Sequence, residues 1–233
     1  MTDELLPRVL DAVRTELGDP STWGAPVQMR DSLALCALNA VHTLQAGTPS
    51  VRRVLQRYRD HRIAAGADPE ADSGPDLLAV IDAAGGPEGF SRDVIANQSK
   101  LPGTMRLRAE GIYEGLRNLE GLGITTAEHL REHAHDPEAK RAWTRVKGLG
   151  SQSWDYVRMN AGVEDVTKPD EMVRRFLYRA VAADVSPTRA RQLVIAAAAE
   201  LGVSARALDR AMWLRESPSG DGERSCAGAE EES

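Results

Sequence analysis

The residues best suited to chemistry lie between positions 143 and 179, where a glycine-rich turn is followed by a single carboxylate. The turn reads Val146-Lys147-Gly148-Leu149-Gly150-Ser151. Glycine adopts backbone conformations that a Cβ atom would forbid, so the segment predicts a tight hairpin between two helices. The second helix would begin near Ser151 and point its first N–H groups, and the positive end of its dipole, toward a phosphate.

Asp170 is the candidate catalytic residue. It follows Lys168-Pro169, lies 18 residues after Gln152, and precedes a predicted helix over residues 171–183. A carboxylate can stabilise the positive charge that develops on a sugar when its glycosidic bond breaks, and it can orient or deprotonate water. The local sequence alone also allows a structural role, in which Asp170 is an ordinary helix N-cap that follows a proline. The spacing from the hairpin favours the catalytic role.

Two further groups of residues complete the candidate site. The residues expected to hold DNA phosphates are Lys147, Gly148, Gly150, Ser151, Gln152 and Lys168. The residues that could line a pocket for a displaced base are Asn39, His42 and Trp154. For Trp154 a core position is the alternative, because aromatic residues at helical spacing usually belong to a core. For Asn39 and His42 the alternative is an ordinary position on a helix surface.

The segments that must position these residues are predicted to be helical throughout. Apolar residues recur every three or four positions, and no alternation long enough for a strand is found. Ser50, Thr126, Ser186 and Ser204 are suitable N-caps. The expected helices include residues 3–17, 28–46, 51–63, 76–84, 104–121, 171–183, 186–200 and 204–215.

Composition restricts the class of protein. A chain of 233 residues can bury a substantial core. Its two cysteines, Cys36 and Cys226, exclude a disulfide framework and a four-cysteine metal or iron–sulfur site. The five histidines show no metal-ligand spacing. No signal peptide and no apolar run long enough for a membrane span are seen, so we expect a cytoplasmic protein. We also expect it to need no cofactor or metal.

The net charge of −6 conceals an uneven distribution. Residues 217–233 hold five acidic residues and one arginine, and their Gly, Ser and Glu content predicts a disordered tail. Residues 140–191 hold eleven Lys or Arg against six Asp or Glu. The positive excess therefore coincides with the hairpin, as expected of a surface that contacts phosphate, although a solvated helical surface would also carry basic residues.

The hairpin and the spaced aspartate resemble the helix–hairpin–helix DNA glycosylase superfamily. Val146-Lys147-Gly148-Leu149-Gly150 and Pro169-Asp170 match its motif, and the wider similarity covers about residues 28–200. Three departures limit what is carried over. Gln152 stands where members that also cleave the strand carry a lysine nucleophile, and two cysteines are too few for the iron–sulfur cluster of some members. Lys147 replaces the usual proline.

The resemblance implies an all-α fold of two lobes with Asp170 in the cleft between them. We expect residues 27–164 to form a helical bundle that includes the hairpin, and residues 1–26 with 165–216 to form the second lobe. The expected function is that of a monofunctional DNA glycosylase, an enzyme that hydrolyses the bond to a damaged or modified base in double-stranded DNA. We expect a monomer that associates with the nucleoid and does not bind membranes. The alternatives are a non-catalytic helix–hairpin–helix DNA-binding protein and a purely helical interaction module.

Overall fold

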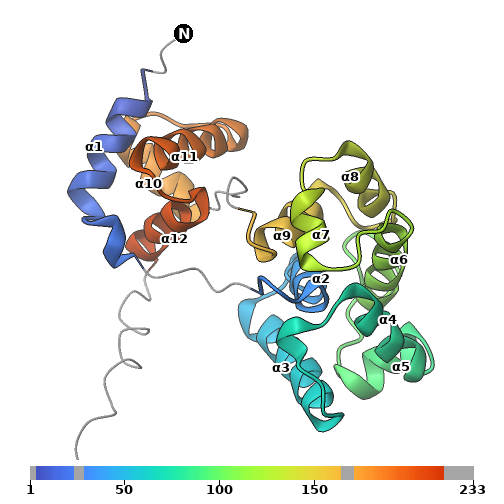
Figure 1. Cartoon of the computed structure of the whole chain (residues 1–233). Helices are drawn as coiled ribbons and strands as arrows, with labels where there is room; N and C mark the ends of the chain where they lie inside the picture. The colour runs from blue at the N-terminus through green and yellow to red at the C-terminus, as the bar shows by residue number, and fades with distance from the viewer. Residues whose placement is uncertain (1–3, 24–28, 164–170, 218–233) are drawn as a thin grey trace, which may run out of the picture. The chain divides into compact units, whose positions relative to one another are not determined.

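The computed structural model describes residues 4–23, 29–163 and 171–217 (Figure 1). Throughout these ranges the regular structure is helical, and the only β-type pairing in them is an isolated bridge between Lys100 and Leu107. The predicted all-α class is therefore confirmed. The chain divides into two compact units: a central unit, residues 28–163, and a terminal unit, residues 1–27 with 164–233. Each unit has its own hydrophobic core.

The central unit is built around α2 (Leu33–His42). Apolar residues occur on all sides of this helix, which is typical of a helix enclosed by others, and nine of its ten residues are buried. Ser32 caps it by accepting a hydrogen bond from the Leu35 amide at 3.2 Å. The helices that pack against α2 are α3 (Thr48–Ala64), α4 (Gly74–Ala83), α6 (Arg108–Glu120), α7 (Ala127–Glu132) and α9 (Ser151–Asn160).

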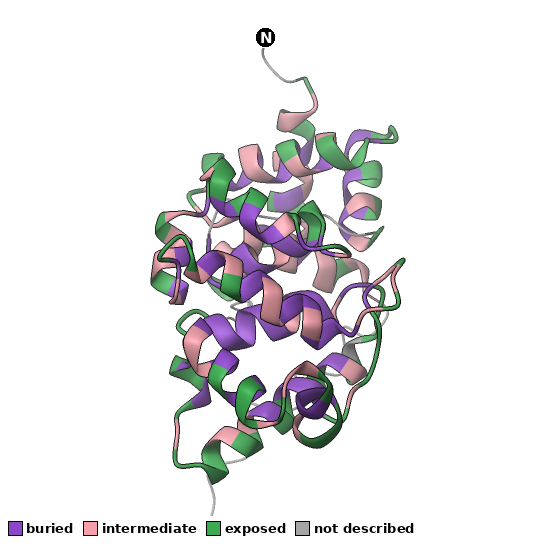
Figure 2. Ribbon diagram, turned by 90° about the vertical axis from the view of Figure 1, so that its right-hand side faces the viewer, coloured by how far each residue is buried: buried purple, intermediate pink, exposed green. Residues whose placement is uncertain are grey.

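Shorter elements complete the central unit. They are the 3-10 turn η2 (Pro69–Ala71), α5 (Pro87–Gly89), the π-helical turn η3 (Phe90–Val94) and α8 (Pro137–Thr144). Polar side chains start several helices, as Thr126 does for α7 and Asp136 does for α8. Most helices carry buried residues on one side and exposed residues on the other (Figure 2), as amphipathic sequences require.

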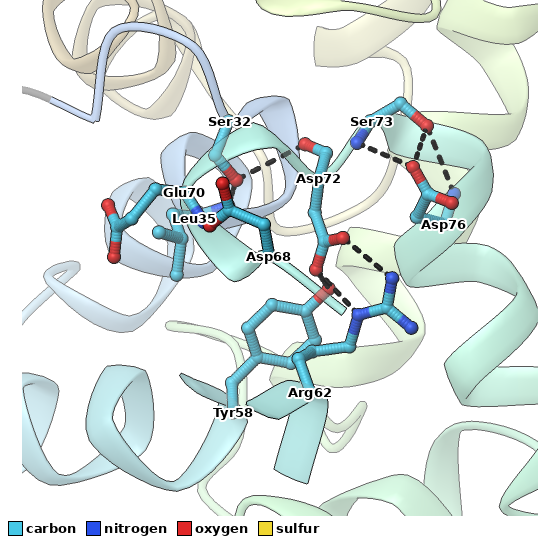
Figure 3. A network of polar contacts seen from close by, with 9 residues as sticks. All are labelled: Ser32, Leu35, Tyr58, Arg62, Asp68, Glu70, Asp72, Ser73 and Asp76. Atoms are coloured by element: carbon cyan, nitrogen blue, oxygen red, sulfur yellow. Dashed lines mark hydrogen bonds and ion pairs between the residues drawn. The ribbon is translucent and has the colours of Figure 1, made fainter. Parts of the chain in front are cut away.

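A buried carboxylate joins α3 to the segment that enters α4 (Figure 3). Asp72 is 4% exposed and accepts two hydrogen bonds from Arg62, both at 2.7 Å, and one from the Tyr58 hydroxyl at 2.7 Å. Its backbone carbonyl accepts a bond from the Ser32 hydroxyl at 3.2 Å. Burial, followed by the bond to Asp72, raises the pKa of Tyr58. The network fixes α2, α3 and α4 around one fully paired charge, the arrangement that a buried ion requires.

Among its described residues, the terminal unit contains η1 (Pro20–Thr22) and the helices α1 (Leu6–Glu16), α10 (Glu171–Val181), α11 (Pro187–Leu201) and α12 (Ala205–Glu216). α10 buries Val173, Phe176, Leu177 and Val181, a spacing that faces one side of a helix. At the ends of the helices, Arg179 pairs with Glu16 at 2.9 Å and with Glu216. α1, α10 and α12 are thus linked by one arginine.

Two helices of the central unit begin later than the sequence predicts. The expected helix 28–46 spans only Leu33–His42, because Ser32 caps its start. The expected helix 104–121 starts at Arg108, because the chain turns between Leu101 and Arg106. Leu101 donates its amide to the Arg106 carbonyl at 2.9 Å, and Gly103 has a positive φ of 69°. In the described ranges, no helix has both the length and the apolar character needed to cross a bilayer.

Candidate phosphate-binding hairpin

The predicted hairpin lies between α8 and α9, and its apolar residues anchor it in the core of the central unit. Val146 is 1% exposed and Leu149 is 3% exposed. The Leu149 amide donates to the Val146 carbonyl at 2.9 Å, which closes the turn. Because these two side chains point inward, the rest of the turn is held at the surface in a fixed orientation.

Gly148 is the position where the turn requires glycine. Its φ is +97°, a conformation that residues with a Cβ rarely adopt. A Cβ added here would lie 2.9 Å from Cβ of Leu101 and 3.2 Å from Cγ2 of Thr104. The hairpin therefore packs directly against the loop that precedes α6, and both the backbone conformation and the close contact exclude a side chain.

Side-chain hydrogen bonds tie the two helices together behind the turn. Nε1 of the buried Trp143, near the end of α8, donates to Oγ of Ser153 at 3.0 Å. That hydroxyl in turn donates to the carbonyl of Gly150 at 2.7 Å. α8 and α9 are thereby fixed relative to each other at the turn, and Ser151 and Gln152 at the start of α9 stay exposed.

The outward face consists of the residues predicted to hold phosphate. Lys147, Gly150, Ser151 and Gln152 are exposed, and Gly148 is half-buried. Gly150 is the N-cap of α9 and offers no side-chain cap. Within the described part of the chain, the amides of Ser151 and Gln152 have no hydrogen-bond acceptor. The turn thus presents free N–H groups and one lysine at a helix N-terminus, the arrangement that binds anions.

The candidate catalytic residue and one DNA-binding candidate lie outside the described residues. These are Asp170 and Lys168. The described chain resumes at Glu171, the first residue of α10. The predicted helix after Asp170 is therefore present, and Asp170 as a catalyst stays a prediction, as does the cleft that would contain it.

The structure does not place the three base-pocket candidates on an open surface. Trp154 is 1% exposed and belongs to the core of the central unit, so its ring has no free face on which a base could stack. His42 is also buried. Asn39 is half-buried, and its Oδ1 accepts a hydrogen bond from Nδ2 of Asn160 at 3.0 Å. Burial gives Trp154 and His42 a packing role, and the base pocket itself stays a prediction.

His42 lies beside a buried cation at the C-terminal end of α2. Arg108 donates to the carbonyl of Val41 and, at 2.6 Å, to that of Leu44, placing its positive charge at the negative end of the helix. Burial, and then the charge of Arg108, lower the pKa of His42 to about 3. Its Nε2 has no hydrogen-bond partner. His42 is therefore neutral at physiological pH and is not a proton donor.

Some surface residues near the hairpin were not singled out from the sequence. Met105 is 84% exposed and follows Thr104, which contacts Gly148. Arg141 and Arg145 line a pocket with Arg117 of α6. The spacing of Arg141 and Arg145, four residues apart on one helix, was visible in the sequence. The contribution of α6 required the fold.

The described ranges contain no group of three or more His, Cys, Asp or Glu side chains arranged to hold a metal ion. Residues 7–217 match the model of a domain family of unknown function, DUF8548. The chain belongs to this family. The DUF8548 match extends from α1 to the end of α12, so both compact units are part of the family domain. No curated protein and no solved structure gives a significant match to the chain.

Proposed function

We propose that this DUF8548 protein is a monofunctional DNA glycosylase that hydrolyses the bond between deoxyribose and a damaged or modified base. The observation that carries the proposal is the hairpin. Gly148 is packed at positive φ, while Lys147 and the free amides at the start of α9 face solvent. Such a turn can grip a DNA backbone without reading its sequence.

The chemistry is assigned to Asp170, which the glycosylase motif places after the hairpin. Its carboxylate would stabilise the positive charge that develops on the sugar and orient the attacking water. The base must leave the helix stack for its sugar to be reached. Met105, an exposed apolar side chain next to the hairpin, is suited to fill the space that the base vacates.

A non-catalytic DNA-binding protein is the second candidate, and one observation favours it. The side chains of Trp154 and His42, which would line a base pocket, are buried in the core. The hairpin accounts for binding to a DNA backbone and does not by itself supply a reaction. Both functions predict DNA binding, so a DNA-binding assay cannot distinguish them. A test for base release can.

Asp170→Asn is the decisive variant. The native protein is first screened on duplexes that contain alkylated, oxidised or deaminated bases, with abasic sites detected by alkaline strand cleavage. For the base that is released, Asp170→Asn is expected to lower the excision rate by at least about a hundredfold, the usual scale for loss of an acid–base group. DNA affinity should stay within a factor of about two, since no phosphate contact is removed.

The neighbouring carboxylate provides a matched control. Glu171 is exposed and lies 3.7 Å from Arg174, so Glu171→Gln should leave excision unchanged. Equal excision by native protein and Asp170→Asn would exclude Asp170 from the mechanism. Absence of base release from every duplex, with salt-sensitive DNA binding retained, would favour the non-catalytic protein.

A further inference from the structure

A pocket of about 560 Å³ lies in the central unit between the C-terminal half of α6 and α8. The two helices pack side by side (Figure 1). The pocket is separate from the amides at the start of α9, although Arg145 on its wall directly precedes the hairpin. Its volume is in the range of sites that bind small molecules and is far larger than one phosphate needs.

Three arginines give the pocket a positive charge. Arg141 has no ion pair or side-chain hydrogen bond in the described part of the chain. Arg145 donates one bond to Oδ1 of Asn118 at 2.6 Å, and Arg117 pairs with Asp82 and Glu120. Only one carboxylate, that of Glu138, lies on the wall. Guanidinium groups with unused N–H donors are the usual partners of phosphate oxygens.

A buried donor on the wall also lacks an acceptor. Nδ2 of Asn118 is buried without a hydrogen-bond partner, while Oδ1 of the same amide is held by Arg145. A buried donor is costly unless an acceptor reaches it. Because Nδ2 is shielded from solvent, a ligand in the pocket would meet this amide through Arg145, whose guanidinium holds Oδ1.

The rest of the wall suits the remainder of a nucleotide. Apolar surface is offered by Leu122, which is 37% exposed, and by Ala142. Gly121 also lines the pocket and has no side chain to fill it. Glu138 can accept hydrogen bonds from a sugar hydroxyl or a base amino group. We propose that this pocket binds a nucleoside monophosphate group, with its phosphate held by Arg141 and Arg145 and its base against Leu122.

Two sources offer this chemistry: a free mononucleotide, and the 5′-phosphorylated end of a DNA strand. Both place a phosphate monoester next to a base. A strand end would have its following phosphates near Lys147 and the start of α9, because Arg145 directly precedes the hairpin. The proposal does not rest on base excision, since none of the pocket residues belongs to the assigned chemistry.

Titration of the full-length protein tests the pocket. Deoxyadenosine monophosphate, deoxyadenosine and inorganic phosphate are compared by calorimetry, and single-stranded oligonucleotides with a 5′-phosphate or a 5′-hydroxyl are compared by fluorescence anisotropy. We expect the monophosphate to bind better than either of its parts. Arg141→Gln should weaken that binding at least about tenfold, the effect of losing a charge-assisted hydrogen bond. Arg141 is exposed, so its variant should fold, as circular dichroism can verify.

The control is Lys140→Gln, which removes an exposed charge on the same helix from a residue outside the pocket wall. It should change the affinity less than twofold.

A preference for the 5′-phosphorylated oligonucleotide that disappears in Arg141→Gln identifies the strand end, and mononucleotide binding without that preference identifies the free ligand. Three outcomes would overturn the proposal. The protein could bind deoxyadenosine as tightly as its monophosphate, Arg141→Gln and Lys140→Gln could lose equal affinity for the monophosphate, or no phosphorylated probe could bind. Asp170→Asn should leave mononucleotide binding intact, so the two proposals can fail separately.

Discussion

At the scale of single residues, two of the buried titratable groups of the central unit, Asp72 and His42, lie in opposite environments. Asp72 receives hydrogen bonds from Arg62 and Tyr58 and is a fully paired charge. His42 has an orphaned Nε2 and lies near the positive charge of Arg108. A paired ion can be buried at little net cost, whereas an unpaired imidazole stays neutral and resists protonation.

The buried imidazole predicts a pH dependence of stability. The pKa of His42 falls from 6.5 to about 3 on folding, so the unfolded chain binds the proton more tightly. The free energy of unfolding is then fully maintained above pH 6.5 and declines as the pH falls toward 3. For one such group the loss is about 1.4 kcal/mol per pH unit. His42→Leu should remove this contribution, as urea unfolding between pH 7 and pH 4 can measure.

The native protein and His42→Leu are compared by the difference between their unfolding free energies at each pH, because every other titrating group is common to both. The native protein should lose more stability than His42→Leu over this interval. Parallel curves of unfolding free energy against pH would show that His42 does not titrate in this way.

At the scale of elements, the hairpin depends on contacts from helices that are distant in sequence. Leu101 and Thr104 contact Gly148 from the loop before α6, and Gly115 within α6 makes room for Trp143 and Leu149. The exposed residues of the turn owe their orientation to these buried ones. Binding and stability should therefore respond differently to substitutions on the two sides of the turn.

Gly148→Val tests the buried side. The new side chain meets both a positive φ and Leu101 at 2.9 Å, so we expect a loss of about 2–3 kcal/mol in unfolding free energy. Gly150→Ser is the matched control. Gly150 has a φ of −111°, no atom within 4 Å of an added Cβ, and the N-cap position of α9. Serine is a better N-cap than glycine, so stability should be unchanged or slightly higher in denaturant titrations. Similar losses in both variants would contradict this account.

At the scale of the whole molecule, basic residues are concentrated in one segment although the net charge of the chain is negative. The chain has a net charge of −6, yet Lys140, Arg141, Arg145 and Lys147 follow one another along α8 and the hairpin. Local fields, rather than net charge, steer an anionic polymer to a surface. An acidic protein can therefore present one basic face to DNA.

The salt dependence of DNA binding tests this distribution. The logarithm of the association constant should fall linearly with the logarithm of salt concentration, because phosphate contacts release counterions. Lys147→Gln should reduce the magnitude of the slope by about one. Arg53→Gln, which removes an exposed charge from α3, should leave it unchanged. Fluorescence anisotropy with an undamaged duplex measures both. An affinity independent of salt, or equal effects of the two variants, would exclude the hairpin as the phosphate contact.

The sequence by itself determined the helical class and the position of the turn. Apolar spacing and capping residues act over a few positions, so Thr126, Ser186 and Ser204 could be recognised as N-caps without the fold. Ser50 is not an N-cap, because α3 begins earlier, at Thr48, with Gly47 as its N-cap. The beginning of α6 was missed because Leu101 pairs with Arg106 and delays the helix.

Only the tertiary structure decided which side chains are available to a ligand. Trp154 and Lys147 lie close together in sequence, yet Trp154 is in the core and Lys147 is exposed. The arginine pocket required α6 and α8 to pack side by side. Exposure depends on which distant helix covers a residue, and local periodicity carries no information about that partner.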